Sequence, residues 1–453
     1  MSAVAGLERY RGRKVGVLGL ARSGRAVAAA MADAGAEVVV FDDNPGTLAA
    51  AGYRRGAPED IPGLALLVPS PGVPLTHPQP HPLIAAARLA GVPVRGDVDL
   101  FADLLGERRV VGITGTNGKS TTTVLVHHLL QAAGVDAVQG GNIGQPVFEL
   151  EPGPPERVFV LELSSYQLDL CNHLHCKVAV WLNLTPDHLD RHGDLAGYVA
   201  AKERIFARQG PGDIAVIGID DAPSQAEALR LRELGRDVVT VSLTDTLSAQ
   251  VAVRGSRLFE GDVDISDLRG LGNLRGRHNW QNVAVAYAAV RALGLRPEQA
   301  IAGLPSFTGL PHRMEEVARS GHVVWINDSK ATNPDSADKS LVSFPCIFWI
   351  AGGKAKPGGF ASLRASLGGV RAAYLIGAAA AEIAADLGDL VPVHEVGTLD
   401  AAVRAASAAA RTADATEAVV LLAPACASFD QFANFEARGD AFRALAVAEV
   451  GAA

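Results

Sequence analysis

Thr114-Gly115-Thr116-Asn117-Gly118-Lys119-Ser120-Thr121 follows directly on the apolar run Arg109-Val110-Val111-Gly112-Ile113. A buried strand, a glycine-rich turn and a helix N-terminus bring backbone N–H groups close to phosphate oxygens. Lys119 is then placed to reach the β and γ phosphates, and the Ser120 hydroxyl to bind Mg²⁺. The GxxxxGK[ST] pattern is met only in part, because Ile113 stands where its first glycine belongs. We therefore predict a phosphate-binding loop here, with a chance Lys-Ser pair after a glycine-rich turn as the alternative.

Glu162 lies downstream, at the end of the apolar run that starts at Val158. A carboxylate at the end of a strand in a parallel sheet is well placed to meet the phosphate-binding loop. Mg²⁺ prefers oxygen ligands and takes few of them from protein, so Ser120 and Glu162 are predicted at one ion. A solvated strand-end carboxylate is the alternative.

Similar strand-and-turn units occur on both sides of this segment. They predict parallel sheets, because strands alternate with helical patterns. The strands are expected at residues 14–19, 37–41, 109–113, 158–161, 178–182, 323–326, 346–350, 373–376 and 419–422, with a helix at 24–34 and a proline-rich loop at 69–82. We predict an α/β chain of three domains: a Rossmann-like domain at 1–106, a P-loop ATPase domain at 107–310, and a Rossmann-like domain at 311–453.

The first of these units carries Gly19-Leu20-Ala21-Arg22-Ser23-Gly24, which has GxGxxG spacing with alanine at the second glycine. Asp42 ends the next predicted strand. Alone, this pattern suggests a dinucleotide site, but it is a weak signal when one glycine is missing.

Composition narrows the class of protein. The 453 residues are 48% hydrophobic and 20% charged, which is typical of a soluble globular protein, and the net charge is -8. No basic run predicts nucleic-acid binding. The start lacks the charge pattern of a signal peptide, and no apolar run reaches the ~18–20 residues of a membrane span. The four cysteines show no CxxC spacing, so we expect reduced thiols and a cytoplasmic protein.

Ordered motifs along the chain carry a family resemblance. They are Thr114–Thr121, Gly141-Asn142-Ile143-Gly144, Glu162–Leu168, Asn183–Arg191, Ala200-Ala201-Lys202, His278-Asn279, His312-Arg313, Asn327–Asn333 and Pro424–Phe432. From Lys14 to Phe442 the sequence resembles the Mur ligases of bacterial peptidoglycan synthesis. The central motifs are shared across that family, whereas Asn327–Asn333 and Pro424–Phe435 resemble its D-glutamate-adding branch.

The resemblance implies an ATP-dependent ligase that joins D-glutamate to UDP-N-acetylmuramoyl-L-alanine through an acyl phosphate. It further implies two Mg²⁺ ions, with His188 helping to hold the second ion. Lys202 matches a lysine that is carbamylated in the family, which would turn a cation into an anionic ligand. Taken alone, Lys202 would be interpreted as a surface lysine of a helix, and His188 as a helix-start residue. The catalytic set is Lys119, Glu162, His188 and Lys202.

Binding residues are also implied by the resemblance. The ATP set is Gly115, Thr116, Asn117, Gly118, Lys119, Ser120, Thr121, Asn279, Arg313 and Asp328. The substrate set is Ser23 and Asp42 for the UDP-sugar, Asn142 and Ser164 with no particular substrate assigned, and Thr332, Lys356, Ser428 and Phe435 for D-glutamate. The run Gly352–Pro357 carries two lysines and lacks the acid that some relatives place before the second. By position we assign Lys356, rather than Lys354, to the glutamate carboxylate.

Other functions remain to be compared with this one. A second Mur ligase or a folylpolyglutamate synthase-like enzyme would share the central chemistry and add another amino acid. A nucleotide-dependent switch is another possibility: the sequence has a DxxG match at Asp190–Gly193, but it has no NKxD motif. A dehydrogenase built on the first motif leaves the phosphate-binding loop unexplained. We expect no nucleic-acid partner, no membrane insertion, and a monomer.

Overall fold

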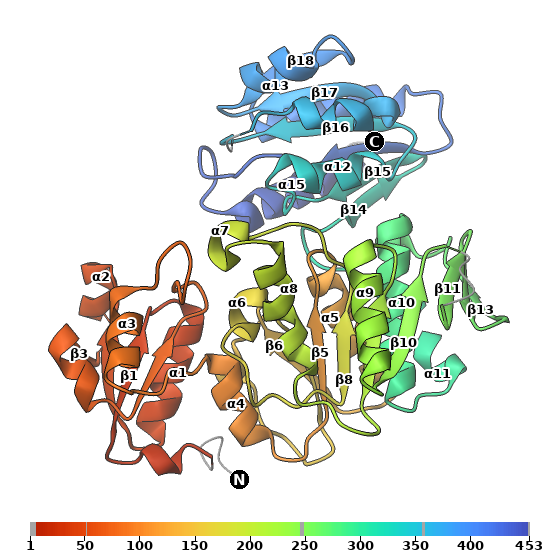
Figure 1. Ribbon diagram of the computed structural model, residues 1–453. Helices are drawn as coiled ribbons and strands as arrows, with labels where there is room; N and C mark the ends of the chain where they lie inside the picture. Colours follow the sequence, from red (N-terminus) through yellow and green to blue (C-terminus); the bar gives the residue numbers. More distant parts are fainter. Residues whose placement is uncertain (1–5, 51, 245–248, 356–357, 452–453) are drawn as a thin grey trace. The chain divides into compact units, whose positions relative to one another are not determined.

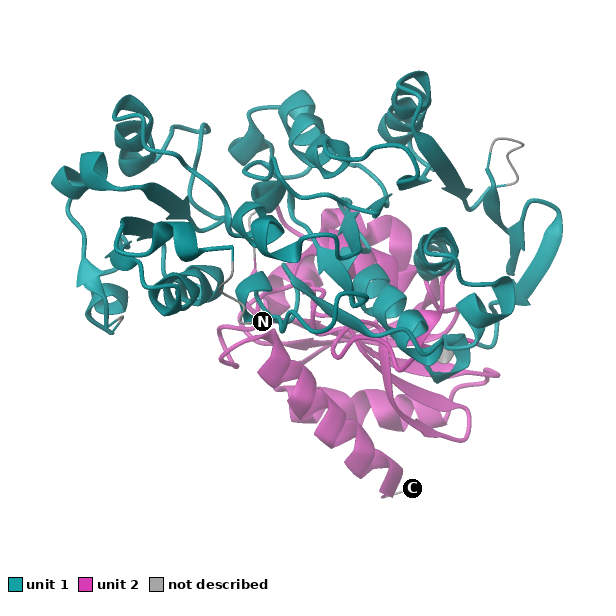
Figure 2. Cartoon of the chain, turned by 90° about the horizontal axis from the view of Figure 1, so that it is seen from below, with its two compact units in different colours: residues 1–270, 277–306 teal, residues 271–276, 307–453 magenta. Residues whose placement is uncertain are grey.

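The computed structural model describes residues 6–50, 52–244, 249–355 and 358–451. The described chain forms two compact units, coloured separately in Figure 2. Unit 1 comprises residues 1–270 and 277–306, and unit 2 comprises residues 271–276 and 307–453. Among the described residues the strands form three sheets: a first and a central sheet in unit 1, and a third sheet in unit 2.

The first sheet has the strand order β3-β2-β1-β4 and is parallel throughout. Its elements are η1 (Glu8–Tyr10), β1 (Lys14–Leu18), α1 (Arg22–Asp33), β2 (Glu37–Phe41), α2 (Pro45–Ala50), β3 (Arg54–Arg55), η2 (Pro58–Gly63), β4 (Leu66–Pro69), α3 (Pro82–Leu89) and α4 (Asp97–Leu105). Apolar side chains on one face pack with α1 and α4, and those on the other face pack with η2 and α3. The predicted strands and loop are confirmed, although α1 begins two residues before the predicted Gly24.

The central sheet has the order β13-β12-β11-β10-β9-β8-β5-β7-β6. Its strands are β5 (Val110–Thr114), β6 (Ala137–Gly141), β7 (Val158–Glu162), β8 (Val178–Trp181), β9 (Ile214–Gly218), β10 (Asp237–Ser242), β11 (Val251–Arg254), β12 (Arg257–Glu260) and β13 (Val263–Asp267). Its helices are α5 (Lys119–Ala132), η3 (Val147–Glu149), α6 (Ser165–Leu168), α7 (Leu189–His192), α8 (Leu195–Glu203), η4 (Arg204–Phe206), α9 (Ala222–Glu233), α10 (Arg277–Ala292), α11 (Pro297–Ile301) and η6 (Leu304–Ser306).

Helices α8 and α9 cover one face of this sheet, and α5 and α10 pack together on the other (Figure 1). The strands from β11 to β6 run parallel, whereas β12 and β13 add an antiparallel edge. That edge was not predicted, because its short strands carry little apolar alternation; their burial is mostly partial.

The third sheet has the order β14-β15-β19-β16-β17-β18, with only the β14–β15 pair antiparallel among the described strands. Its elements are η5 (Gly272–Leu274), β14 (Glu315–Ser320), β15 (Val323–Asn327), α12 (Pro334–Leu341), β16 (Ile347–Gly352), η7 (Ala361–Gly369), β17 (Val370–Ile376), α13 (Ala380–Leu387), β18 (Val393–Gly397), α14 (Leu399–Arg411), β19 (Ala418–Leu422) and α15 (Phe435–Gly451). Successive apolar residues of its strands point to opposite faces of the sheet. Those on one face pack on α12, η7 and α13, and those on the other pack on α14 and α15.

Each sheet places an inner strand between neighbours that belong to different parts of the chain: β1 between β2 and β4, β5 between β8 and β7, and β19 between β15 and β16. Ligands of open α/β sheets bind beyond the carboxyl ends of such strands. Predicted site residues follow each of these three strands: Ser23 after β1, Gly115–Thr121 after β5 and Ser428 after β19.

The four cysteines are buried and form no disulfide, as predicted. Burial raises the pKa of the Cys426 thiol to about 12, so this thiol stays protonated at neutral pH. No helix in the described ranges is long and apolar enough to span a bilayer.

Candidate active site

The turn between β5 and α5 has a backbone shape that glycine makes possible. Gly115 has a φ of 151° and Gly118 a φ of 84°. A Cβ at Gly118 would lie 2.4 Å from Oδ1 of Asn282, and one at Gly115 would lie 2.9 Å from Cβ of Leu182. Both glycines are thus required by backbone conformation and by space.

Hydrogen bonds fasten this loop to the segment after β8. Thr116 N donates to Asn183 O at 3.0 Å, and Asn117 N donates to Oδ1 of Asn183 at 2.9 Å. The Thr116 hydroxyl donates to Thr185 O at 3.0 Å. The loop is therefore held in place before any ligand arrives, so binding would not have to order it.

Lys119 and Ser120 open helix α5, as the motif predicts. The Lys119 ammonium donates to Gly115 O and to Thr116 O, each at 2.9 Å, and so folds back over its own loop. The Ser120 side chain is largely buried, and Thr121 is half-buried beside it. This places a cation, a hydroxyl and a helix N-terminus around one loop, which suits a polyphosphate.

Glu162 ends β7 next to this loop, since β7 is the neighbour of β5 in the sheet. The residue is 2% exposed. Its Oε1 accepts a hydrogen bond from Nδ2 of Asn142 at 2.7 Å, whereas its Oε2 has no hydrogen-bonding partner among the described residues. A buried carboxylate oxygen without a partner is costly, and a bound cation would satisfy it.

The described residues contain no group of three or more His, Cys, Asp or Glu side chains that could hold a metal ion by themselves. This suits Mg²⁺, which is usually bound by one or two carboxylates together with substrate phosphates. The unpaired oxygen of Glu162 and the hydroxyl of Ser120 at the start of α5 are ligand types that fit such an ion.

Lys202 is 1% exposed, although it lies in helix α8. Its ammonium donates to Gly115 O at 2.8 Å and to the Thr114 hydroxyl at 3.2 Å, and lies 4.8 Å from the ring centroid of Tyr198. Burial, followed by the positive charge of Lys119, lowers the pKa of Lys202 well below its usual value. The surface position that the isolated sequence suggested for this lysine is therefore wrong.

His188 caps helix α7 with a left-handed backbone, at φ 52°. Its Nδ1 lies 3.0 Å from the Tyr166 hydroxyl, and its ring centroid lies 6.4 Å from that of Tyr198. His188 is exposed. His188 therefore stands at the start of a helix, and the tyrosine ring that contacts Lys202 also borders this histidine.

A cavity of 420 Å³ lies between the first and the central sheet. Its lining includes Ser23, Ser70, Asn142 and Gln167. Ser23 lies in the first turn of α1, and Asn142 follows β6. The two predicted substrate-binding residues Ser23 and Asn142 therefore line one cavity.

Asp42, the other predicted residue of the first sheet, is not among the residues that line this cavity. Its carboxylate accepts hydrogen bonds from Leu20 N at 2.7 Å and from Asn44 N at 2.9 Å. It therefore fixes the turn from β1 into α1. A Cβ at Gly24 would lie 1.9 Å from Gly19 O, so helix and strand approach each other too closely for any other residue.

Ser164 caps helix α6 directly after β7. Its hydroxyl and its backbone N–H both donate to Oε1 of Gln167 at 3.1 Å. Ser164 is half-buried, and it stands two residues from Glu162, so the same short turn carries two predicted site residues.

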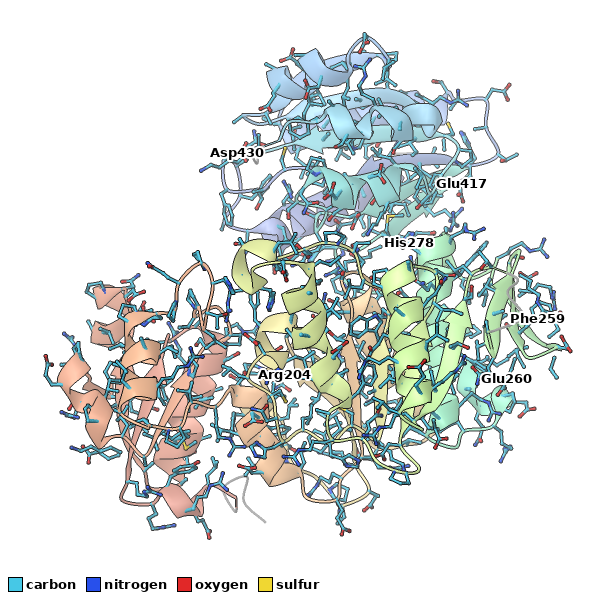
Figure 3. The ribbon with its side chains drawn as sticks, viewed as in Figure 1. Arg204, Phe259, Glu260, His278, Glu417 and Asp430 are labelled. Atoms are coloured by element: carbon cyan, nitrogen blue, oxygen red, sulfur yellow. The ribbon has the colours of Figure 1, made fainter. Side chains whose placement is uncertain are left out.

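Asn279 lies in the first turns of α10 and is buried. Its Oδ1 accepts from Nδ2 of Asn282 at 3.2 Å, and Oδ1 of Asn282 accepts from the Thr122 hydroxyl at 3.3 Å. Figure 3 labels His278 at the start of this helix. These contacts connect Asn279 to the phosphate-loop helix.

Asp328 follows β15 in unit 2 and is buried. One oxygen accepts from the Ser340 hydroxyl, and the other from Met314 N at 3.3 Å. Burial raises the pKa of Asp328 to about 6, against the opposing charge of Arg313. Arg313 is thus close enough to Asp328 for its charge to act on that carboxylate, and both residues belong to the predicted ATP set.

The predicted amino-acid residues of unit 2 follow β15 and β19. The Lys330 ammonium lies 4.0 Å from the ring centroid of Phe435. Thr332 is half-buried. Ser428 is 2% exposed, and its hydroxyl has no hydrogen-bonding partner in the part of the chain that the structure describes.

The run after β16 approaches the same loop. Lys354 N donates to Ala427 O at 2.8 Å, and Ala427 N donates to Lys354 O at 3.0 Å. Asp430, labelled in Figure 3, accepts from Ala378 N at 3.0 Å. Lys356 lies outside the described residues.

The sequence prediction missed several side chains that shape these regions. Tyr198 contacts both Thr116 and Lys202, and only its i, i+4 spacing from Lys202 could have indicated it. Arg438 is 1% exposed and donates to Ser329 O at 3.0 Å and to Cys426 O at 3.1 Å. Burial lowers the pKa of Arg438 to about 10. Asn282 was missed as well.

Two family models match the chain in succession. The Mur ligase middle domain matches residues 113–290, and the Mur ligase glutamate ligase domain matches residues 312–426. The UDP-N-acetylmuramoylalanine–D-glutamate ligase of Nitrobacter winogradskyi is 50% identical over 455 residues, which cover 98% of each chain. The ligase of the same name from Chelativorans sp. is 48% identical, over 96% of this chain and 95% of its own.

Solved structures share the fold at lower identity. A UDP-N-acetylmuramoyl-L-alanyl-D-glutamate–2,6-diaminopimelate ligase superimposes with a TM-score of 0.58 at 18% identity, over 98% of this chain and 93% of its own. The UDP-N-acetylmuramate-alanine ligase of Thermotoga maritima gives 0.57 at 19% identity, over 97% and 99%. Successive family models, near-complete alignment at half identity and a shared α/β architecture lead to one conclusion: this chain belongs to the Mur ligase family.

Proposed function

We propose that this protein joins D-glutamate to UDP-N-acetylmuramoyl-L-alanine and converts ATP to ADP and phosphate, in the cytoplasmic synthesis of peptidoglycan precursors. The observation that carries this proposal is the match, over 98% of both chains, to a ligase named for that reaction. The phosphate-binding loop and the carboxylate beside it are the parts that such a ligase needs. We expect the protein to act as a monomer.

The proposal assigns one substrate to each of the three predicted domains. Residues 1–106 would bind the UDP-sugar, residues 107–310 ATP, and residues 311–453 the amino acid. The separate sheets support this division, since each has its own set of loops beyond the carboxyl ends of its strands.

The chemistry begins with a poor electrophile, the carboxylate of the alanine residue. Transfer of the γ-phosphoryl group of ATP makes an acyl phosphate, which the amine of D-glutamate attacks with loss of phosphate. Lys119 would contact the β and γ phosphates, with backbone N–H groups from Gly115 to Thr121 around them. Prearranged positive charge of this kind stabilises the charge that spreads over the transferring group.

Ser120 and Glu162 would hold one Mg²⁺, and His188 with the carbamate of Lys202 would hold a second. Bound Mg²⁺ neutralises phosphate charge and positions the transferring group. The supporting observation is the unpaired Oε2 of buried Glu162.

Carbamylation of Lys202 has a physical basis in its surroundings. Only the neutral amine reacts with CO₂; its nitrogen forms a bond to carbon and the proton leaves to solvent. Burial lowers the pKa of Lys202, which raises the neutral fraction at physiological pH. The product is an anion beside Lys119, so it would replace repulsion between two ammonium groups with attraction.

Remaining residues are assigned by substrate. Asn279, Arg313 and Asp328 would bind ATP away from its phosphates, and Asp328 the ribose. Ser23, Asp42, Asn142 and Ser164 would serve the UDP-sugar. Thr332, Lys356, Ser428 and Phe435 would surround D-glutamate, and the unpaired hydroxyl of buried Ser428 supports a ligand there.

Asp42→Ala should raise KM for the UDP-sugar much more than KM for ATP. The substitution removes two acceptors that hold the Leu20 and Asn44 N–H groups, so the turn into α1 loosens beside the cavity. Initial rates of phosphate release, measured with each substrate varied in turn, check this. A parallel rise in both KM values, or a change confined to ATP, would move the uridine site elsewhere.

D-Glutamate should support rapid phosphate release, and L-glutamate, D-aspartate and diaminopimelate little or none. With both carboxylates held, inversion of the α-carbon swings the amine away from the acyl phosphate, and a 1 Å misplacement can cost ~10²-fold. D-Aspartate is one methylene short and leaves a carboxylate partner unpaired, at a further cost of about 1–3 kcal/mol.

The assay is phosphate release with UDP-N-acetylmuramoyl-L-alanine saturating and each amino acid added or omitted. Equal rates with the two glutamate enantiomers would reject D-specificity. A preference for diaminopimelate or lysine would place the protein in another branch of the family, the second function considered above. Lys356→Ala should raise KM for D-glutamate more than Lys354→Ala does.

A further inference from the structure

Arg191 lies in helix α7 and is a buried cation that the proposed reaction does not use. It is 5% exposed. Its Nη2 donates a hydrogen bond to Val73 O at 3.1 Å, but its Nε and Nη1 have no hydrogen-bonding partner within the described ranges. A buried guanidinium with unpaired donors is unfavourable for folding, so the presence of an arginine at this position calls for another reason.

Two side chains near Arg191 compensate its charge. The guanidinium carbon lies 5.4 Å from the ring centroid of Tyr166, which is within the range of a cation–π contact. Nη1 lies 3.6 Å from Oδ2 of Asp169, which makes an ion pair but is too long for a hydrogen bond. Both partners belong to the central-sheet part of the chain, whereas the hydrogen bond to Val73 O reaches the first-sheet part.

Val73 belongs to the wall of the 420 Å³ cavity. We call residues 70–73, which follow β4, the wall turn; all four of them line the cavity. At the start of the wall turn the Ser70 hydroxyl donates to Gly19 O at 2.6 Å, and Val73 N closes the turn by donating to Ser70 O at 3.0 Å. The first-sheet part thus fixes one end of the wall turn, and Arg191 holds the other.

Helix α7 meets the same proline-rich loop a second time. Gly193 follows α7 with a φ of 87°, and a Cβ there would lie 2.9 Å from Nε2 of His77, so glycine permits a close approach. At its other end α7 begins after His188, whose Nδ1 lies 3.0 Å from the Tyr166 hydroxyl. Tyr166 therefore contacts both Arg191 and His188, and one short helix connects the cavity wall to the histidine.

Arg88 holds the same loop in a different way. It lies in α3 and is exposed, and its Nη1 donates to Leu75 O at 2.9 Å. Because α3 packs on the first sheet, this hydrogen bond ties the loop to its own sheet. Arg88 and Arg191 thus each donate to a backbone carbonyl of one loop, but of the two only Arg191 does so from an element of the central-sheet part.

We propose that Arg191 is a positioning residue for the UDP-sugar: its hydrogen bond to Val73 O fixes the wall turn relative to α7 and His188. This inference rests on the proposed function, since it takes the cavity as the UDP-sugar site. The proposed reaction requires the alanine carboxylate of that substrate to meet the γ phosphate of ATP, and a displacement of about 1 Å can cost ~10²-fold in rate. Functional sites commonly break a rule of stable folding, which accounts for the unpaired donors.

Arg191→Met keeps most of the side-chain volume and removes the charge and the donors. We expect KM for UDP-N-acetylmuramoyl-L-alanine to rise about tenfold, the loss expected for one hydrogen bond from a charged donor, while KM for ATP stays within twofold. Calorimetric titration of the UDP-sugar without ATP should show the same factor in Kd. The melting temperature should equal or exceed that of the wild type, because an apolar side chain often replaces a buried ionic one without loss of stability.

Arg88→Met is the matched control. It removes a hydrogen bond to the same loop from the first-sheet side, and it should leave KM and Kd for the UDP-sugar within twofold of the wild type. If Arg191→Met does not fold, Arg191→Lys replaces it. Lysine keeps the charge beside Asp169 but lacks the planar fork of donors, so KM and Kd for the UDP-sugar should rise by a smaller factor, about threefold.

A lower melting temperature in Arg191→Met with unchanged KM and Kd for the UDP-sugar would show a structural role and overturn the inference. An equal rise in KM for ATP would overturn it as well, and so would an equal effect of Arg88→Met. A wild type that releases no phosphate with UDP-N-acetylmuramoyl-L-alanine and D-glutamate would instead refute the proposed function, and the positioning role with it. Normal wild-type turnover with unaffected Arg191 variants would reject the positioning role alone.

Discussion

Lys202→Ala should reduce kcat by at least ~10²-fold, the cost expected when one preorganised charged group is removed from a dry catalytic site. The side chain is 1% exposed and contacts Gly115 O and the Thr114 hydroxyl, directly at the phosphate-binding loop. As a carbamate it would supply two anionic oxygens for Mg²⁺. Steady-state phosphate release under saturating substrates measures the loss.

Acetate or formate should restore part of the activity of Lys202→Ala. The substitution vacates a space in which a small carboxylate can present the same pair of oxygens that the carbamate does. His188→Ala provides the control: it should lose activity too, but a carboxylate does not replace an imidazole, so no rescue is expected. An active variant that ignores added carboxylates would contradict the carbamate, and so would intact mass spectra and crystal density showing only an unmodified amine in active wild type.

Lys119→Ala should abolish turnover with the fold intact, again by at least ~10²-fold in kcat. In the structure its ammonium donates to two carbonyl groups of the phosphate-binding loop, Gly115 O and Thr116 O. Circular dichroism and the melting temperature should match those of the wild type, while phosphate release falls to background.

Lys177→Ala is a suitable companion for that experiment. Lys177 lies in unit 1 as well, but its ammonium pairs with Asp213 at 3.3 Å and with Gly212 O, at the opposite ends of the strands. Its loss should leave kcat unchanged. Near-normal turnover in Lys119→Ala would remove the phosphate-loop assignment, whatever the companion variant does.

Local patterns predicted much of this architecture. Apolar runs bounded by glycine, proline or aspartate identified β1, β2, β5, β7, β8, β15, β16, β17 and β19 to within a few residues. The reason is that a buried strand needs a short continuous apolar segment, and a close loop needs glycine, so both leave marks in adjacent residues. Motif order along the chain then indicated the family, which the full-length relatives confirm.

Partial burial hid other elements. The edge strands β12 and β13 have mixed polarity because one or both of their faces meet water. β12 pairs with β11 and with β13, its neighbours along the chain, but the sequence does not show which of their side chains the rest of the fold covers. The same limit applies to charged side chains, whose burial depends on what packs over them.

What the sequence by itself determined was part of the set of strands, the glycine-rich loop after β5 and the chemical types of the side chains that follow those strands. Only the tertiary structure decided which of those side chains are desolvated and which lack partners. Lys202 belongs to an ordinary helix by pattern, yet packing beneath Tyr198 and the loop at Gly115 buries it and lowers its pKa. Asp97 and Asp99 look alike in sequence, but neighbours from distant segments satisfy Asp99 alone. Hydrophobic periodicity and turn-forming residues are local features of a sequence. The desolvation of a side chain and the pairing of its hydrogen-bonding atoms depend on all the residues that folding brings around it.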